Sequence, residues 1–238
     1  LDGLTITPPA DSSADFNLTV TATSSEDGTQ ATTSSTLEVS VSGVADALTL
    51  TVEAASGAED SAIALDITSS LSDTDGSETL SLTVTGIPDG AILSAGTLND
   101  DGSVTLTPGQ LDGLTITPPA DSSADFNLTI TATTSEDGTS ATTSSTLEVT
   151  VSGVADTPSV TVNAASGAED SAIALDITSS LSDTDGSETL SLTVTDIPEG
   201  AILSAGTLND DGSVTLTPEQ LDGLTITPPA DSSADFNL

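Results

Sequence analysis

The sequence FNLTITATTSEDGTSATTSSTLEVTVS, residues 126–152, consists of two runs in which apolar residues alternate with Thr, Ser or acid. A period of two residues is typical of a strand with one buried face, and Thr is itself a good strand former. The turn sequence Glu136-Asp137-Gly138 separates the runs, so the stretch predicts two neighbouring antiparallel strands. The alternating apolar positions are Leu128, Ile130, Ala132, Leu147, Val149 and Val151.

The same alternation continues on the N-terminal side of this stretch. Further runs begin near residues 48, 63, 80, 104 and 114, with turn sequences between them, and Asp101-Gly102 predicts a tight hairpin turn. At least seven short strands in about 110 residues, with no helical period, predict an antiparallel β-sandwich. Its core would be aliphatic, with one Phe per repeat (Phe16, Phe126 and Phe236).

The chain is internally repeated. The phrase LDGLTITPPADSSADFNL begins at Leu1, Leu111 and Leu221, so the period is 110 residues, and 12 positions differ between the first two periods. The run VSGVAD reads as a strand end followed by a short acidic link, so we place domain boundaries after Asp46 and Asp156. Residues 1–46 would be the C-terminal part of a first repeat, 47–156 a complete repeat, and 157–238 a third repeat without its last strands. We therefore expect the chain to be a fragment of a longer protein.

The composition excludes several classes of function. The chain has 38 Asp and Glu residues, no Lys, Arg, His, Cys, Met, Trp or Tyr, and a net charge of −38. Nucleic acids and anionic membrane surfaces both need a cationic partner, and no run approaches the 18 apolar residues of a membrane span. Disulfides, thiolate or imidazole metal sites, and catalysis by His, Cys, Lys, Tyr or Arg are impossible. With 35% hydrophobic residues the chain is nevertheless not a disordered acidic tail.

The acids recur at positions where successive loops should alternate between the two ends of a sandwich. Those expected near the start of the complete repeat are Asp46, Asp73, Asp75, Glu78, Glu136 and Asp137. Those expected near its end are Glu59, Asp60, Asp121, Asp125 and Asp156, and the third repeat adds Glu169, Asp170, Asp183, Asp185 and Glu188. By contrast, we interpret Asp66, Asp89, Asp100 and Asp101 as solvated turn residues.

Clustered carboxylates repel one another, and this chain has no cationic side chain to neutralise them. Ca²⁺ accepts six to eight oxygen ligands from flexible loops, including carboxylates and backbone carbonyls, and fits such loops better than Mg²⁺. The acids listed above are therefore predicted Ca²⁺ ligands at the domain junctions. The loop that starts at Asp73 is not an EF-hand, because its twelfth residue is Val84 rather than Glu.

The phrases GVADTPSVTV, GAEDSAIALDI, SDTDGSETLSLTV, DGSVTLTPEQLDGLTITPPAD and TLEVTVSG cover nearly the whole repeat. In these phrases the sequence resembles the tandem extender repeats of giant bacterial adhesins exported by type I secretion, the repetitive RTX adhesin group. The resemblance implies Ig-like or cadherin-like sandwiches joined in series, with Ca²⁺ stiffening each junction. By the logic of cadherins, it also implies that Glu59, Asp156, Asp183 and Asp185 share calcium.

We thus expect a structural spacer, not an enzyme. The resemblance implies that it lies on the outside of a bacterial cell, where it would hold an adhesive tip away from the surface for attachment or biofilm formation. Its partners would be neighbouring repeats. The alternative is a lectin-like adhesive module, although sugar sites generally use aromatic stacking and this chain has no Trp or Tyr. Segments 157–220 and 1–46 are complementary parts of one repeat, so a neighbouring chain could also complete the fold head to tail.

Overall fold

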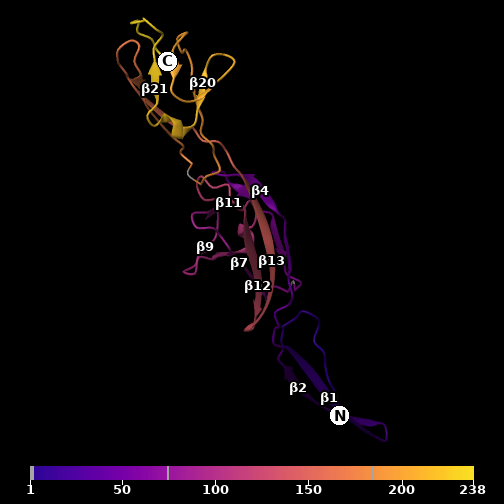
Figure 1. Ribbon diagram of the computed structural model, residues 1–238. Coiled ribbons are helices and arrows are strands. Elements are labelled where there is room, and N and C mark those ends of the chain that lie inside the picture. The colour runs from indigo at the N-terminus through magenta and orange to yellow at the C-terminus, as the bar shows by residue number, and fades with distance from the viewer. Residues whose placement is uncertain (1–2, 74, 184) are drawn as a thin grey trace. The chain divides into compact units, whose positions relative to one another are not determined.

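The computed structural model describes residues 3–73, 75–183 and 185–238, and the described chain divides into two compact units (Figure 1). Unit 1 comprises Leu1–Ala120 and Ala124–Ser152, and unit 2 comprises Asp121–Ser123 and Gly153–Leu238. Both are all-β, apart from one short 3₁₀ helix in each. No helix among the described residues is long and apolar enough to cross a membrane.

Unit 1 contains a β-sandwich built from alternating sequence. Its large sheet has six strands in the order β4 (Ala55–Ala58), β13 (Thr139–Ser152), β12 (Phe126–Glu136), β7 (Thr79–Thr85), β10 (Val104–Leu106) and β9 (Thr97–Leu98). The other layer consists of a three-stranded sheet, β5 (Ile63–Ala64), β11 (Thr115–Thr117) and β8 (Ile92–Leu93), and a two-stranded sheet, β3 (Thr49–Val52) and β6 (Ile67–Ser70). The 3₁₀ helix η1 (Pro108–Gln110) joins β10 to β11.

The two sheet layers meet in one aliphatic core, as the period of two predicts. Leu82 and Val84 of β7 and Leu128 and Ile130 of β12 are 0% exposed, and Ile116 of β11 is buried with them. The alternate Thr and Ser residues of the same strands are mostly exposed or half-buried. Phe126 only packs against the edge of this core, so the aromatic residue is less central than the sequence suggests.

The sandwich departs from the expected antiparallel pattern at one pair of strands. The strand predicted near residue 48 is β3, and it pairs antiparallel with β6. A strand that was not predicted, β4, follows it and pairs parallel with β13. The chain therefore crosses from one layer to the other between Val52 and Ala55. The expectation of a wholly antiparallel sandwich is wrong at this edge.

Turns rich in Asp and Gly connect the strands. Asp137 (φ 44°) and Gly138 (φ 82°) form the two-residue turn between β12 and β13, a geometry that needs residues tolerant of positive φ. The tight hairpin turn predicted at Asp101-Gly102 is present in the loop between β9 and β10. The Gly102 amide donates to the Asn99 carbonyl (3.1 Å), and the Asn99 amide donates to the Ser103 carbonyl (2.8 Å).

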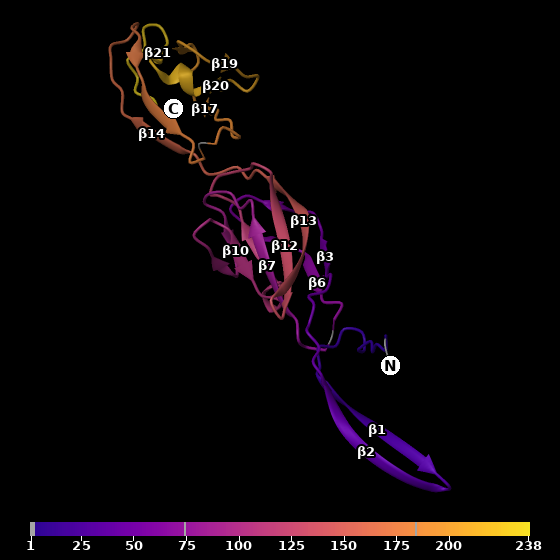
Figure 2. The same cartoon turned by 90° about the horizontal axis from the view of Figure 1, so that it is seen from below.

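Unit 1 also holds a long hairpin, β1 (Phe16–Glu26) and β2 (Thr29–Val39), whose strands lie side by side in Figure 2. Its register is that of β12 and β13, with Leu18 facing Leu37 as Leu128 faces Leu147. The hairpin contributes to no larger sheet among the described residues. Its apolar face is therefore open, with Val20 55% and Leu37 54% exposed.

Apart from β4, which has no counterpart there, the described residues of unit 2 form the same order of elements as the first part of the sandwich in unit 1. Its strands form three small sheets: β14 (Ser159–Asn163) with β16 (Asp176–Ser180); β15 (Ile173–Ala174), β21 (Thr225–Thr227) and β18 (Ile202–Leu203); and β17 (Leu192–Val194), β20 (Val214–Leu216) and β19 (Thr207–Leu208). The 3₁₀ helix η2 (Pro218–Leu221) precedes β21. The core is small, with Val214, Leu216, Leu221 and Leu224 buried.

Candidate metal site

Acidic side chains gather in unit 1 at the end of the sandwich where the chain enters it. Carboxylate oxygens of Asp73, Asp75 and Glu136 all lie within 4.8 Å of one another. Asp73 and Asp75 come from the loop between β6 and β7, whereas Glu136 is the last residue of β12. The alternation of loops between the two ends of a sandwich is what brings them together, as the sequence predicts.

Three of the acidic side chains at this end of the sandwich are buried. Asp73 is 4% exposed, Glu136 is 6% exposed and Glu78 is 8% exposed. Oε1 of Glu136 and Oε2 of Glu78 are buried and have no hydrogen-bond partner. A buried polar atom without a partner costs about 1–3 kcal/mol, and more when it is charged. The site therefore holds carboxylate oxygens that a cation would satisfy.

The preceding segment of chain, 41–46, is bonded to this same end of the sandwich. Oε1 of Glu78 accepts a hydrogen bond from the Asp46 amide (2.5 Å), and Oδ2 of Asp137 accepts one from the Gly43 amide (2.9 Å). The hydroxyl of Thr134 donates to the carbonyl oxygen of Asp46 (2.8 Å). Asp46, Asp73 and Glu136 also line a pocket of about 310 Å³ that residues 7–13 help to close.

Gly43 has a packing role at this point. A Cβ on residue 43 would overlap the Glu136 side chain, at its Cγ, Cδ and Oε1 atoms. A side chain at residue 43 would therefore displace the Glu136 carboxylate from its position beneath the chain. Sequence reasoning treated this Gly only as the end of a strand, and nothing local to VSGVAD shows that Glu136 will lie beneath it.

The loop between β6 and β7 is shaped by its own side chains. Oδ1 of Asp73 accepts a hydrogen bond from the Asp75 amide (2.7 Å), and Oδ1 of Asp75 accepts one from the Ser77 amide (2.8 Å). Hydrogen bonds from the hydroxyl and then the amide of Ser77 lower the pKa of Asp75, and the amide of Ser13 adds to the effect. The role of these serines was missed from the sequence, although Asp-x-Ser is a recognisable turn signal.

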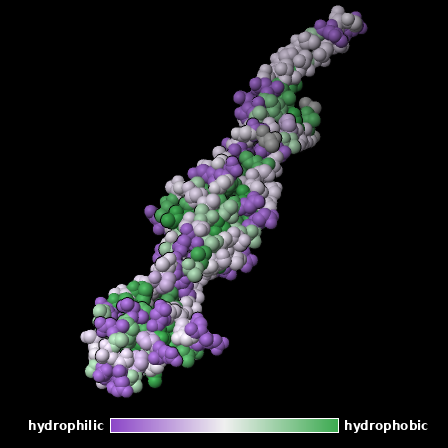
Figure 3. All heavy atoms as spheres, turned by 90° about the horizontal axis from the view of Figure 1, so that it is seen from above, coloured by the Kyte–Doolittle hydropathy of each residue, from purple (hydrophilic) through white to green (hydrophobic). Residues whose placement is uncertain are grey.

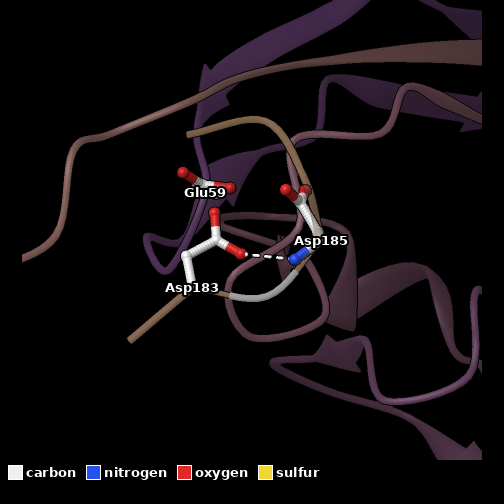
Figure 4. Close-up of side chains that lie close together, drawn as sticks. All are labelled: Glu59, Asp183 and Asp185. Atoms are coloured by element: carbon white, nitrogen blue, oxygen red, sulfur yellow. Dashed lines mark hydrogen bonds between the residues drawn. The ribbon is translucent and has the colours of Figure 1, made fainter. Parts of the chain in front are cut away.

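Unit 2 repeats this loop geometry. In Figure 4 the amide of Asp185 points at the Asp183 carboxylate, to which it donates a 2.7 Å hydrogen bond. Asp183 is 2% exposed, and the Asp156 amide donates to Glu188 (2.5 Å) as the Asp46 amide does to Glu78. Hydrogen bonds from the Ser187 hydroxyl, the Ser187 amide and the Ser123 amide lower the pKa of Asp185.

Carboxylate oxygens of Asp121 and Asp156, both in unit 2, lie within 4.8 Å of each other. This proximity is what the sequence analysis expects at the end of the complete repeat.

Other predicted ligands have structural contacts instead. Oδ1 of Asp125 accepts a hydrogen bond from the Val151 amide (2.7 Å), and Oδ1 of Asp170 accepts one from the Asp231 amide (3.0 Å). Glu59 is 2% exposed, whereas Glu169, at the same position one repeat later, is exposed. Asp60 is exposed and has a φ of 56°. The sharing of one ion by Glu59, Asp156, Asp183 and Asp185 stays a prediction, as do the metal roles of the remaining acids.

The donor set in unit 1 is made of oxygen atoms only, and the sequence has no His or Cys that could add nitrogen or sulfur. Hard cations prefer such ligands, whereas zinc and copper favour imidazole and thiolate. The described residues thus include clusters of acidic side chains that could hold a metal ion through oxygen ligands.

Comparison with known proteins adds little. No family model matches the chain, and no curated protein matches it. Among solved structures, the chain is similar to murine CEACAM1b, with 16% sequence identity over 76% of this chain and 94% of that chain and a TM-score of 0.26. The description of the fold therefore rests on the sheets and the core themselves.

Proposed function

We propose that these repeats are a structural spacer of Ig-like or cadherin-like sandwiches, in which Ca²⁺ bound near each junction stiffens the chain. The spacer would stand outside a bacterial cell, as part of an exported adhesin, and would hold an adhesive part away from the surface. The domains would be the repeats bounded at Asp46 and Asp156. No catalytic role is proposed for any residue.

One observation supports this proposal above the others. The buried carboxylates of Asp73, Glu78 and Glu136 lie at the point where residues 41–46 reach the sandwich, and the same loops hold that segment by hydrogen bonds. An ion bound by Asp73, Asp75 and Glu136 would therefore fix the segment that joins one repeat to the next. Fixing it would turn a flexible connection into a rigid one.

The chemistry of the acids supports calcium as the ion. Several buried carboxylates in one place oppose each other, and no Lys or Arg exists in the chain to offset them. Ca²⁺ tolerates irregular coordination by carboxylates, carbonyls and water, which suits ligands drawn from loops and a strand end. In this site Asp73, Asp75 and Glu136 would be the carboxylate ligands.

Small-angle scattering and thermal unfolding of the 238-residue chain, in calcium and in chelator, test the proposal. We expect calcium to raise both the maximum dimension and the melting temperature. The variant D73N/D75N/D183N/D185N should lose both responses. The matched control D66N/D89N/D100N/D210N also removes four charges, all of them exposed and outside the site, and should keep both responses.

The two measurements are read together. An unchanged maximum dimension and an unchanged melting temperature on adding calcium to the unsubstituted chain would refute the proposal. Equal responses in the two variants would refute the assignment of the site.

A further inference from the structure

The segment 63–70 of unit 1 has a neighbouring strand along only part of one edge. The Leu65 amide donates a hydrogen bond to the Leu114 carbonyl (2.9 Å), which continues the pairing of β5 with β11. Beyond this bond the two segments separate, because the chain that precedes Leu114 turns away through Gly113 (φ 71°) to η1. In the described sheets, β6 therefore has β3 on one edge and no strand on the other.

The alternation of main-chain groups along a strand shows which residues face the open edge of β6. The Glu53 amide donates to the Asp66 carbonyl (3.1 Å), so residues 66, 68 and 70 direct their amides and carbonyls to β3. Ile67 and Ser69 direct theirs to the opposite edge, where the described residues give them no hydrogen-bond partner. Ile67 is only 4% exposed. Because unpaired main-chain groups withdrawn from water cost free energy, this edge favours a ligand that supplies donors and acceptors.

A groove of about 540 Å³ runs along this open edge. It is lined by residues 64–69, 108 and 111–115. Leu111 and Pro108 contribute apolar surface, whereas Asp66 and Asp112 contribute two exposed carboxylates. Hydrophobic and hydrophilic surface also lie next to each other on the face of the molecule drawn in Figure 3. The groove thus offers main-chain pairing, apolar contact and negative charge to one ligand.

Unit 2 contains the same groove. The Leu175 amide donates to the Leu224 carbonyl (2.9 Å), and β16 pairs with β14 along its other edge. The groove beside β16 also measures about 540 Å³, and Asp176 and Asp222 line it at the positions of Asp66 and Asp112. Residues 173–179 repeat 63–69, and residues 221–227 repeat 111–117, without a change. The groove is therefore a property of these two segments and recurs with the repeat.

We propose that each groove binds an extended peptide segment with basic side chains, which adds to β6 or β16 as an antiparallel strand where β11 or β21 diverges. Pairing with the main chain of Ile67 and Ser69 supplies affinity, and the groove selects alternate side chains. Basic side chains of the segment meet Asp66 and Asp112, which no Lys or Arg of this chain can neutralise.

The charge of the chain determines the kind of partner. A second copy carries the same charge of −38 and has no basic segment to offer, so the peptide belongs to a different, basic protein. β6 is four residues long, so a segment of about four residues, roughly 13 Å when extended, fills its edge. This inference does not depend on calcium.

NMR titration of the ¹⁵N-labelled 238-residue chain tests the proposal, in chelator and at about 0.15 M salt so that long-range attraction is screened. The probe is the blocked peptide acetyl-Lys-Val-Lys-Val-amide, which places Lys on one face of a strand and Val on the other. We expect the amide signals of Ile67, Ser69, Ile177 and Ser179 to shift, with a dissociation constant of about 1 mM or below. The same amides should exchange with solvent more slowly when the peptide is bound.

Two methylated peptides separate strand pairing from charge without changing the protein. In the proposed antiparallel arrangement, the Val residues face Ile67 and Ser69 and direct their amides to β6. N-methylation of both Val residues removes these donors and should weaken binding at least about tenfold, as expected for two hydrogen bonds of about 1 kcal/mol each. N-methylation of both Lys residues modifies the edge that faces solvent and should leave binding unchanged.

The variant D66N/D112N tests the charge, and unit 2 serves as its internal reference. Removing two exposed charge pairs should weaken binding at Ile67 and Ser69 by about two- to thirtyfold. Binding at Ile177 and Ser179 should stay as it was. The matched control D89N/D100N removes two exposed charges outside the groove and should leave both sites unchanged.

Four results would overturn the proposal. Equal binding of the two methylated peptides would exclude strand pairing, and equal weakening by D66N/D112N and D89N/D100N would show attraction to the overall charge only. Signals of Ile67 and Ser69 that shift with protein concentration alone would assign the groove to a second copy of the chain. Signals that stay unchanged up to about 10 mM peptide would show that the groove binds no such segment.

Discussion

Replacing Glu136 by Gln should change the stability of the sandwich in opposite directions in chelator and in calcium. Glu136 is 6% exposed, its Oε1 has no hydrogen-bond partner, and its carboxylate lies within 4.8 Å of the oxygens of Asp73 and Asp75. In chelator, E136Q removes a buried charge and introduces an amide that can donate to the other two carboxylates. The gain is about 1–3 kcal/mol, the cost of one buried unsatisfied group. At about 4–8 °C per kcal/mol for a domain of this size, the melting temperature rises by at least about 4 °C.

In calcium the unsubstituted chain should instead be more stable than E136Q. Calcium at a hundred times its dissociation constant stabilises the protein by about 2.7 kcal/mol, and a variant that lacks one carboxylate ligand binds the ion more weakly and gains less. Thermal unfolding followed by far-UV circular dichroism measures both conditions. The control is E26Q, the same position one repeat earlier, where the side chain is exposed, and it should change neither value. The reasoning fails if E136Q is less stable than the unsubstituted chain in chelator, or if calcium stabilises both to the same extent.

Three further results are expected. L147A should lower the free energy of unfolding by about 2–5 kcal/mol, because Leu147 is buried. L37A, in a nearly identical sequence, should lower it by about 1 kcal/mol or less, because Leu37 is 54% exposed. Equal shifts of the urea midpoint in the two variants would contradict this difference in burial. Hydrogen bonds from the side chain and backbone of Ser103 lower the pKa of Asp101 from its usual 3.8, so the stability it contributes is complete above that value and is lost as the pH falls through the lowered pKa. NMR titration should therefore show a higher Asp101 pKa in S103A, and no change would be evidence against the hydrogen bond. G43A should weaken calcium binding in calorimetry, because the added methyl group displaces the buried carboxylate beneath it; unaltered affinity would mean that this carboxylate is not a ligand.

Much of the sandwich could be predicted from the period of two in the sequence. The alternation at Leu128, Ile130 and Ala132 gives the strand and its buried face, and these residues are 0% exposed. The strand β4 could not be predicted, because it lies outside the alternating runs and is a strand through its pairing with β13. The ASGA sequence by itself does not determine a strand.

The sequence predicts which loops form the candidate site, but not the burial and contacts of the individual side chains. Alternation of loops places Asp73, Asp75 and Glu136 at one end of the sandwich, and they do lie together. The burial of Glu78 and the passage of Gly43 over Glu136 depend on tertiary contacts between residues up to 94 positions apart. The sequence of one loop contains no signal for them.

In unit 1, β7 pairs with β12 and β4 pairs with β13, and both partners come later in the chain, which has a consequence for folding. During synthesis each repeat would expose its unfinished edge until its last two strands have left the ribosome, because the contacts they make span long stretches of sequence. With 12 differences in 110 positions, the hairpin of one repeat is nearly interchangeable with that of the next. Folding in the order of synthesis, with each repeat closed before its successor emerges, would limit misassembly between such similar neighbours.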